Sequence, residues 1–97
     1  MITIRWVEGG RHANAADDAR AAAAAEASLR AAGVADYVAA EVAFRAAMER
    51  GDADPYEAGD WLAAAWQHAT SAACIAATQG WHDPNGGAVE LYAHRRA

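Results

Sequence analysis

The chain has 97 residues, of which 55% are apolar types and 22% are charged. Thirteen carboxylates outnumber eight basic residues, all of them arginines, so the formal net charge is −5 at pH 7. This length suits one compact domain, residues 1–97, with a thin core because much of the apolar content is alanine. A net negative chain is repelled by phosphate, which argues against direct binding of DNA or RNA.

A single cysteine, Cys74, excludes an intrachain disulfide and a zinc site built from several cysteines. A reducing compartment is the natural setting for such a chain, so we expect a cytoplasmic protein. The N-terminal residues lack the long apolar stretch of a signal peptide, and no run of about eighteen apolar residues free of charges is present. Neither secretion nor a membrane span is predicted.

The N-terminal part predicts a strand followed by a helix. Residues 2–7 alternate in the manner of a half-buried strand, with Ile2, Ile4 and Trp6 on the core side. A helix is expected from the capping residue Asn14 to about Ala32, rich in alanine and ended by Gly33. The alanines favour the helix and allow neighbouring backbones to approach closely.

A second helix is predicted from near Asp36 to just before Gly51. Two apolar ridges are expected on it, formed by Tyr37, Phe44 and Met48 and by Val34, Val38 and Val42. Between the ridges, Glu41, Arg45 and Glu49 follow i, i+4, i+8 spacing and can form ion pairs. This stripe is interpreted as a solvated helix face, with a binding stripe as the alternative.

The third helix has two candidate starts. Asp54, Pro55 and Glu57 resemble a capping box, whereas Gly59 favours a start at Asp60 and a helix to about Thr78. Trp61, His68 and Ile75 align at heptad spacing beside Leu62 and Trp66, which predicts an inward apolar face and a core histidine at position 68.

The C-terminal residues 81–92 predict a β-hairpin around a turn rich in glycine, with Val89, Leu91 and Ala93 facing the core and Glu90, Tyr92 and His94 facing outward. The element order is then β-α-α-α-β-β. The predicted fold is α+β, with three helices packed on one face of a small, about three-stranded antiparallel sheet. The large aromatic side chains, above all the four tryptophans, are expected to carry most of the stability.

No catalytic motif is recognisable, and neither a cofactor nor a metal site is predicted. The four histidines have no metal-binding spacing, so a metal site would have to be assembled by the fold. Cys74 and His68 lie about 120° apart on a helix and should not meet, which disfavours a cysteine nucleophile. The protein is therefore not expected to be an enzyme.

Two surfaces are candidates for binding a protein partner. The outward sheet face would present the residues Arg5, Glu90, Tyr92 and His94. An acidic segment, defined as residues 49–60, holds the five carboxylates Glu49, Asp52, Asp54, Glu57 and Asp60, with Arg50 as its one basic residue. Such a segment suits a basic groove, because complementary charges speed association.

In its size, net charge, acidic segment and absence of catalytic motifs, the chain resembles the small inhibitors that phages and mobile elements encode, anti-CRISPR proteins among them. The resemblance is one of type and assigns no role to individual residues. It implies an acidic protein that docks on a basic, nucleic-acid-handling partner, such as a CRISPR surveillance complex, and presents carboxylates where phosphates would lie, as a DNA mimic does. It is expected to be a monomer or homodimer.

Two alternatives stay open. The chain could be a small metal-binding or enzymatic domain that uses the hairpin residues His82, Asp83 and His94. It could also be an accessory domain that self-associates through its alanine faces and an intermolecular disulfide at Cys74.

Overall fold

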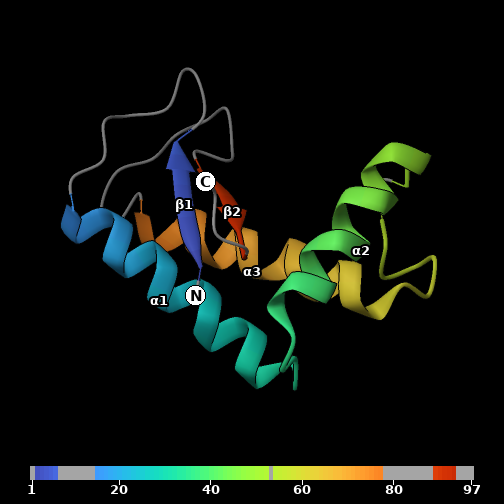
Figure 1. Cartoon of the computed structure of the whole chain (residues 1–97), viewed down its shortest axis with the longest axis horizontal. Helices are drawn as coiled ribbons and strands as arrows, with labels where there is room; N and C mark the ends of the chain where they lie inside the picture. The colour runs from blue at the N-terminus through green and yellow to red at the C-terminus, as the bar shows by residue number, and fades with distance from the viewer. Residues whose placement is uncertain (1, 7–14, 53, 78–88, 94–97) are drawn as a thin grey trace.

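The computed structural model of this chain describes residues 2–6, 15–52, 54–77 and 89–93. In chain order the elements are β1 (Thr3–Trp6), α1 (Ala15–Ala31), α2 (Tyr37–Arg50), α3 (Trp61–Ala77) and β2 (Val89–Tyr92). Figure 1 shows α1 and α3 crossing beneath the two strands, with α2 beside the N-terminal half of α3. The helix α3 therefore contacts α1, α2 and β2, and forms the centre of the fold.

The predicted α+β fold with a three-stranded sheet is wrong. In the part of the chain that the structure describes, three helices of 17, 14 and 17 residues form a mostly helical globule with one antiparallel pair of four-residue strands. The pair β1–β2 aligns Thr3 with Tyr92 and Trp6 with Val89. The other predicted hairpin strand, which begins after Gly80, lies outside the described residues. The helices bury their apolar faces mainly against one another, so the strands do not form a layer that all three helices cover.

The contact between α1 and α3 is built from small side chains. On α1, Ala21, Ala25 and Leu29 have no exposed surface, and on α3 Ala69 and Ala73 are equally buried. Residues four apart lie on one side of a helix, so each helix presents a nearly flat strip of methyl groups to the other. The separation of packed helices depends on the side chains between them, and alanine permits a close approach.

The predicted limits of α1 and α2 are confirmed at the ends that the structure describes. The Asp36 side chain accepts a hydrogen bond from the Ala39 N–H at 3.0 Å and caps α2, while Gly51 ends it with a φ of 79°. Gly33, also at φ 79°, follows the last turn of α1. This left-handed conformation is strained for other residues, which explains the glycines at both ends. The predicted cap Asn14 lies outside the described residues.

Of the two predicted starts for α3, the later one is confirmed. Asp60 caps the helix, because its Oδ1 accepts a hydrogen bond from the Ala63 N–H at 3.2 Å. Residues 54–59 form a separate turn, in which Asp54 Oδ1 accepts from the Glu57 N–H at 3.2 Å. The capping-box start at Asp54 is therefore wrong for α3, although Asp54 does act as a local cap. None of the three helices described is both long and apolar enough to cross a bilayer.

Candidate functional site

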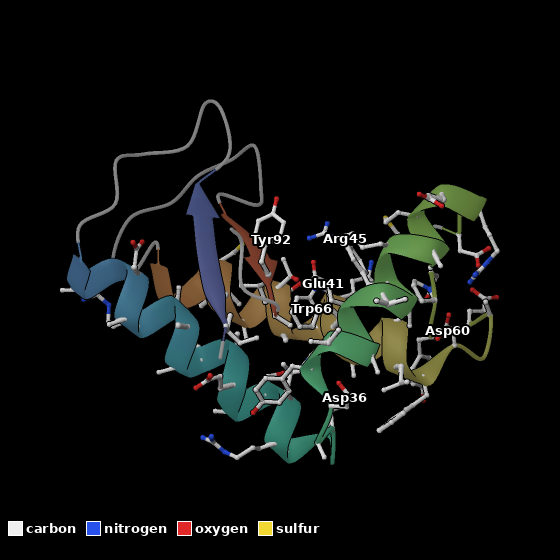
Figure 2. The ribbon with its side chains drawn as sticks, viewed as in Figure 1. Asp36, Glu41, Arg45, Asp60, Trp66 and Tyr92 are labelled. Atoms are coloured by element: carbon white, nitrogen blue, oxygen red, sulfur yellow. The ribbon has the colours of Figure 1, made fainter. Side chains whose placement is uncertain are left out.

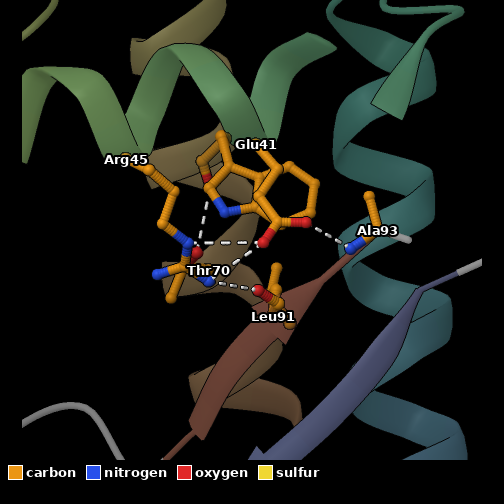
Figure 3. Close-up of polar contacts among 6 residues, drawn as sticks. Glu41, Arg45, Thr70, Leu91 and Ala93 are labelled. Atoms are coloured by element: carbon orange, nitrogen blue, oxygen red, sulfur yellow. Dashed lines mark hydrogen bonds and ion pairs between the residues drawn. The ribbon is translucent and has the colours of Figure 1, made fainter. Parts of the chain in front are cut away.

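The middle of α2 contains a buried carboxylate. Glu41 was expected on a solvated face, but its side chain is only 2% exposed. It accepts a hydrogen bond from the Ala93 N–H at 2.7 Å through Oε1 and binds the Arg45 guanidinium at 3.2 Å through Oε2 (Figure 3). Arg45 Nη2 also donates to the Leu91 carbonyl at 3.0 Å. The predicted Glu41–Arg45 ion pair is confirmed, and it fastens β2 to α2.

This clamp, defined as Glu41 and Arg45 with Leu91 O and Ala93 N, covers one edge of β2. Alternate residues of a strand turn their N–H and C=O groups to the same edge. Figure 3 shows Leu91 and Ala93 meeting α2 on the edge of β2 that faces away from β1. Side chains of α2 thus form hydrogen bonds with the Leu91 C=O and the Ala93 N–H, which on an uncovered edge would be free to pair with another strand. The clamp explains the buried charge structurally and does not require a ligand.

The predicted binding surface on the sheet is not assembled as expected. Tyr92 is 8% exposed, so its outward orientation is wrong, and the Arg45 guanidinium lies 5.0 Å from its ring centroid (Figure 2). A cation above an aromatic face is attracted to it. Arg5 and Glu90 are opposite each other in the strand register, and His94 lies outside the described residues. Tyr92 therefore packs against Arg45 of the clamp and offers little surface to a partner.

The acidic segment is organised around Arg50. Its guanidinium binds Asp52 Oδ2 at 3.0 Å and Asp60 Oδ2 at 3.3 Å, which joins the end of α2 to the start of α3. The hydrogen bond to Asp52, followed by that to Asp60, raises the pKa of the Arg50 guanidinium above its ordinary value, although desolvation opposes the rise. Both carboxylates thus favour the charged form of Arg50.

The five predicted carboxylates therefore divide by role. Asp52 and Asp60 are half-buried partners of Arg50, and Asp60 also caps α3. Asp54 caps its own turn, and the side chains of Glu49, Asp54 and Glu57 are exposed. With five carboxylates and one guanidinium, the segment keeps an excess of negative charge. The carboxylates most accessible to a partner are thus Glu49, Asp54 and Glu57.

Large apolar side chains lie next to these carboxylates and are open to solvent. Tyr56, between Asp54 and Glu57 in the chain, is 78% exposed, and Trp61 at the start of α3 is 52% exposed. The inward apolar face predicted for α3 is therefore wrong: Trp61, His68 and Ile75 all face outward, and His68 is not a core histidine. Trp66 is instead the buried member, at 1% exposure. Alanine, not the larger residues, fills the contact with α1, so Trp61, His68 and Ile75 lie outside that contact.

A groove runs between α1 and α3 on this outer side, with a volume of about 420 Å³. We call it the α1–α3 groove, and its lining includes Ser28 and Ala32 of α1, Tyr56, and Trp61, Ala64 and His68 of α3. Sequence reasoning missed this groove because it expected the heptad-spaced residues to point inward. The alanines spaced four apart in both helices, Ala21 and Ala25 with Ala65, Ala69 and Ala73, are the signal that could have indicated it.

The remaining candidate residues are Cys74 and those of the metal-binding alternative. Cys74 is half-buried and packs against the core. His82 and Asp83, from the metal-binding alternative, lie outside the described residues, as does His94. Within the described ranges no three His, Cys, Asp or Glu side chains gather in a way that could hold a metal ion.

In comparisons with known proteins, no protein-family model, curated protein or solved structure matches this chain.

Proposed function

We propose that the protein is a small protein-binding inhibitor that docks on a basic partner through the acidic segment and the aromatic side chains beside it. One observation carries the proposal: Tyr56 is exposed in the turn that carries Asp54 and Glu57, and it lines one groove together with the exposed Trp61. Tyrosine and tryptophan are the residues that most often dominate binding energy at protein interfaces. Carboxylates around them steer a basic partner and fix its orientation.

The expected partner handles nucleic acid. Exposed carboxylates on the acidic segment can lie where phosphates would bind, because a groove that attracts a phosphate backbone attracts any suitable array of negative charges. The net charge of −5 on the whole chain also favours association with a positively charged partner. Competition follows from this arrangement: DNA or RNA should displace the protein from its partner.

The proposal is tested by capturing partners on immobilised protein from nuclease-treated lysate of the source cells. Wild-type protein is compared with the double variant Glu49→Arg/Glu57→Arg, which reverses two exposed carboxylates, and with Glu26→Arg/Asp18→Arg, which makes the same change in net charge on α1. A partner that fits the proposal is retained by wild type and by the α1 variant, and is lost from the acidic-segment variant.

Two further measurements use the captured partner. Its complex should weaken as salt rises, because exposed charges are screened within about 8–10 Å at moderate ionic strength. Double-stranded DNA added to the complex should release the protein. A partner that both charge variants retain equally, or that neither salt nor DNA affects, would refute the proposal.

A further inference from the structure

The helix α3 has an unusual composition for a helix with an exposed side. Its 17 residues, WLAAAWQHATSAACIAA, contain no Asp, Glu, Lys or Arg. It therefore lacks the charged face that a surface helix normally turns to solvent. One side of α3 is covered, because Trp66 and Ala73 are buried, but Trp61 is 52% exposed and Ile75 is 74% exposed. Exposed apolar surface of this kind marks interaction sites.

The exposed residues form a continuous stripe. The exposed residues Trp61, His68, Ser71 and Ile75, with the half-buried Ala64 among them, lie within about 80° of one another around the helix axis, opposite Trp66. From Trp61 to Ser71 the stripe follows the α1–α3 groove for about 15 Å, which is the length of a helix of about ten residues. Alanines 32, 64 and 65 line the groove, so the backbone of an incoming helix could approach closely.

Charge distinguishes the two ends of this surface. The stripe itself contains no Asp, Glu, Lys or Arg, whereas the Trp61 end adjoins the turn that carries Asp54 and Glu57. An occupant that matches both parts has an apolar face along its length and positive charge at one end. A second copy of this chain brings the same net charge of −5, which disfavours it as the occupant.

We infer that the α1–α3 groove binds an amphipathic helix of the partner, with the apolar face of that helix on α3 and its arginines or lysines over the turn at residues 54–57. This inference rests on the proposed function, since it assumes a basic protein partner. To the proposed function it adds where the partner binds, in the α1–α3 groove, and which structure the bound segment has, a helix. Binding of an apolar helix face in a hydrophobic groove is a recurrent mode of peptide recognition.

The test uses a synthetic helical peptide of 14 residues, with leucine and alanine on one face and three arginines at one end. Two control peptides accompany it: one has glutamates in place of the arginines, and one has the same composition with the apolar residues scrambled off their common face. Each is titrated into the full-length ¹⁵N-labelled protein, and binding is followed by amide chemical shifts. The arginine peptide should shift the amides of Tyr56, Trp61, His68 and Ser71, and the controls should bind at least tenfold more weakly.

Variants locate the contact. Ser71→Arg places charge and bulk on the exposed stripe without altering the acidic segment, and should weaken peptide binding at least tenfold. Trp61→Ala should do the same. Ala23→Arg is the matched control, because Ala23 is exposed and lies about 140° around α1 from Ser28, so it should leave binding unchanged.

Several outcomes overturn the inference. Peptide affinity that is unchanged in Ser71→Arg would place the contact elsewhere, and so would the absence of binding by all three peptides at millimolar concentration. Light scattering that shows a wild-type dimer dissociated by Ser71→Arg would make a second copy the occupant. Partner capture that depends on Glu49 and Glu57 but not on Ser71 would leave the proposed function standing and refute the helix-in-groove contact alone.

Discussion

The backbone N–H of Ala93 donates a hydrogen bond of 2.7 Å to Oε1 of Glu41, a carboxylate 52 residues earlier in the chain. The other oxygen of Glu41, Oε2, binds Arg45, which also donates a hydrogen bond to the Leu91 carbonyl. One helix thereby supplies both an acceptor and a donor to the edge of β2. A buried carboxylate is stable only when its partners replace the lost water, and this clamp provides them.

Replacing Glu41 should therefore destabilise the fold. Glu41→Gln keeps an oxygen that can accept from Ala93 but removes the ion pair with Arg45. We expect the free energy of unfolding to fall by about 1–3 kcal/mol, because Arg45 is left with an uncompensated charge that is only partly open to water. Urea denaturation followed by circular dichroism measures the change.

The matched control is Glu49→Gln, on the same helix but exposed. It should change the free energy of unfolding by no more than about 0.5 kcal/mol. Equal effects of the two variants would mean that the clamp adds nothing to stability.

The close contact between α1 and α3 makes a second prediction. Ala25 has no exposed surface, so the larger side chain of Ala25→Leu must push the helices apart or adopt a strained conformation. Overpacking of this kind lowers stability by about 1–3 kcal/mol. Ala23→Leu makes the same change at an exposed position of α1 and should be nearly neutral. Thermal unfolding compares the two variants. If Ala23→Leu lowers stability as much as Ala25→Leu, the helices are not tightly packed at Ala25.

These positions also show which features the sequence could predict. Asp36 and Gly51 are recognisable because capping depends on a few neighbouring residues, and both ends of α2 were predicted correctly. Residues 2–7 and 89–92 were recognised as extended from their alternation, which is also local. The number of strands that pair could not be read in this way, since pairing depends on residues far apart in the chain.

The burial of Glu41 and the exposure of Trp61 have the same explanation. Spacing along α2 and α3 shows which residues share a helix side, but it does not show which side meets another element. Glu41 is buried because Ala93 lies beside it, and Trp61 is exposed because alanines fill the contact with α1. The acidic segment was found from composition alone, whereas the groove beside it required the packing of α1 against α3.

The start of α3 offers a third prediction, which separates a cap from an ion pair. Asp60 accepts from the Ala63 N–H and also binds Arg50. Asparagine caps helices about as well as aspartate, so Asp60→Asn should keep the cap and lose only a partly exposed ion pair, a change of about 0.5 kcal/mol. Asp60→Ala removes both and should lower stability by about 1–2 kcal/mol. Chemical denaturation measures the free energy of unfolding of both variants. If Asp60→Asn loses as much as Asp60→Ala, the stabilisation comes from the ion pair with Arg50 and not from the cap.

The two tryptophans of α3 give the last prediction. Trp66 is 1% exposed and Trp61 is 52% exposed, so the same substitution should affect stability far more at Trp66 than at Trp61. Trp66→Ala should lower the free energy of unfolding by about 3–5 kcal/mol, close to the whole stability of many small domains. Trp66→Phe keeps an aromatic ring at this buried position and should lower the free energy of unfolding by less, so it provides a variant that stays folded.

Trp61→Ala should change stability by about 1 kcal/mol or less, because much of its ring is already in water. Its effect should lie in binding instead, since it lines the α1–α3 groove. Urea denaturation of the three variants, followed by circular dichroism, measures the difference directly. A loss at Trp61→Ala as large as that at Trp66→Ala would mean that the exposed stripe of α3 supports the fold, and would remove the reason to regard it as a surface kept for a partner.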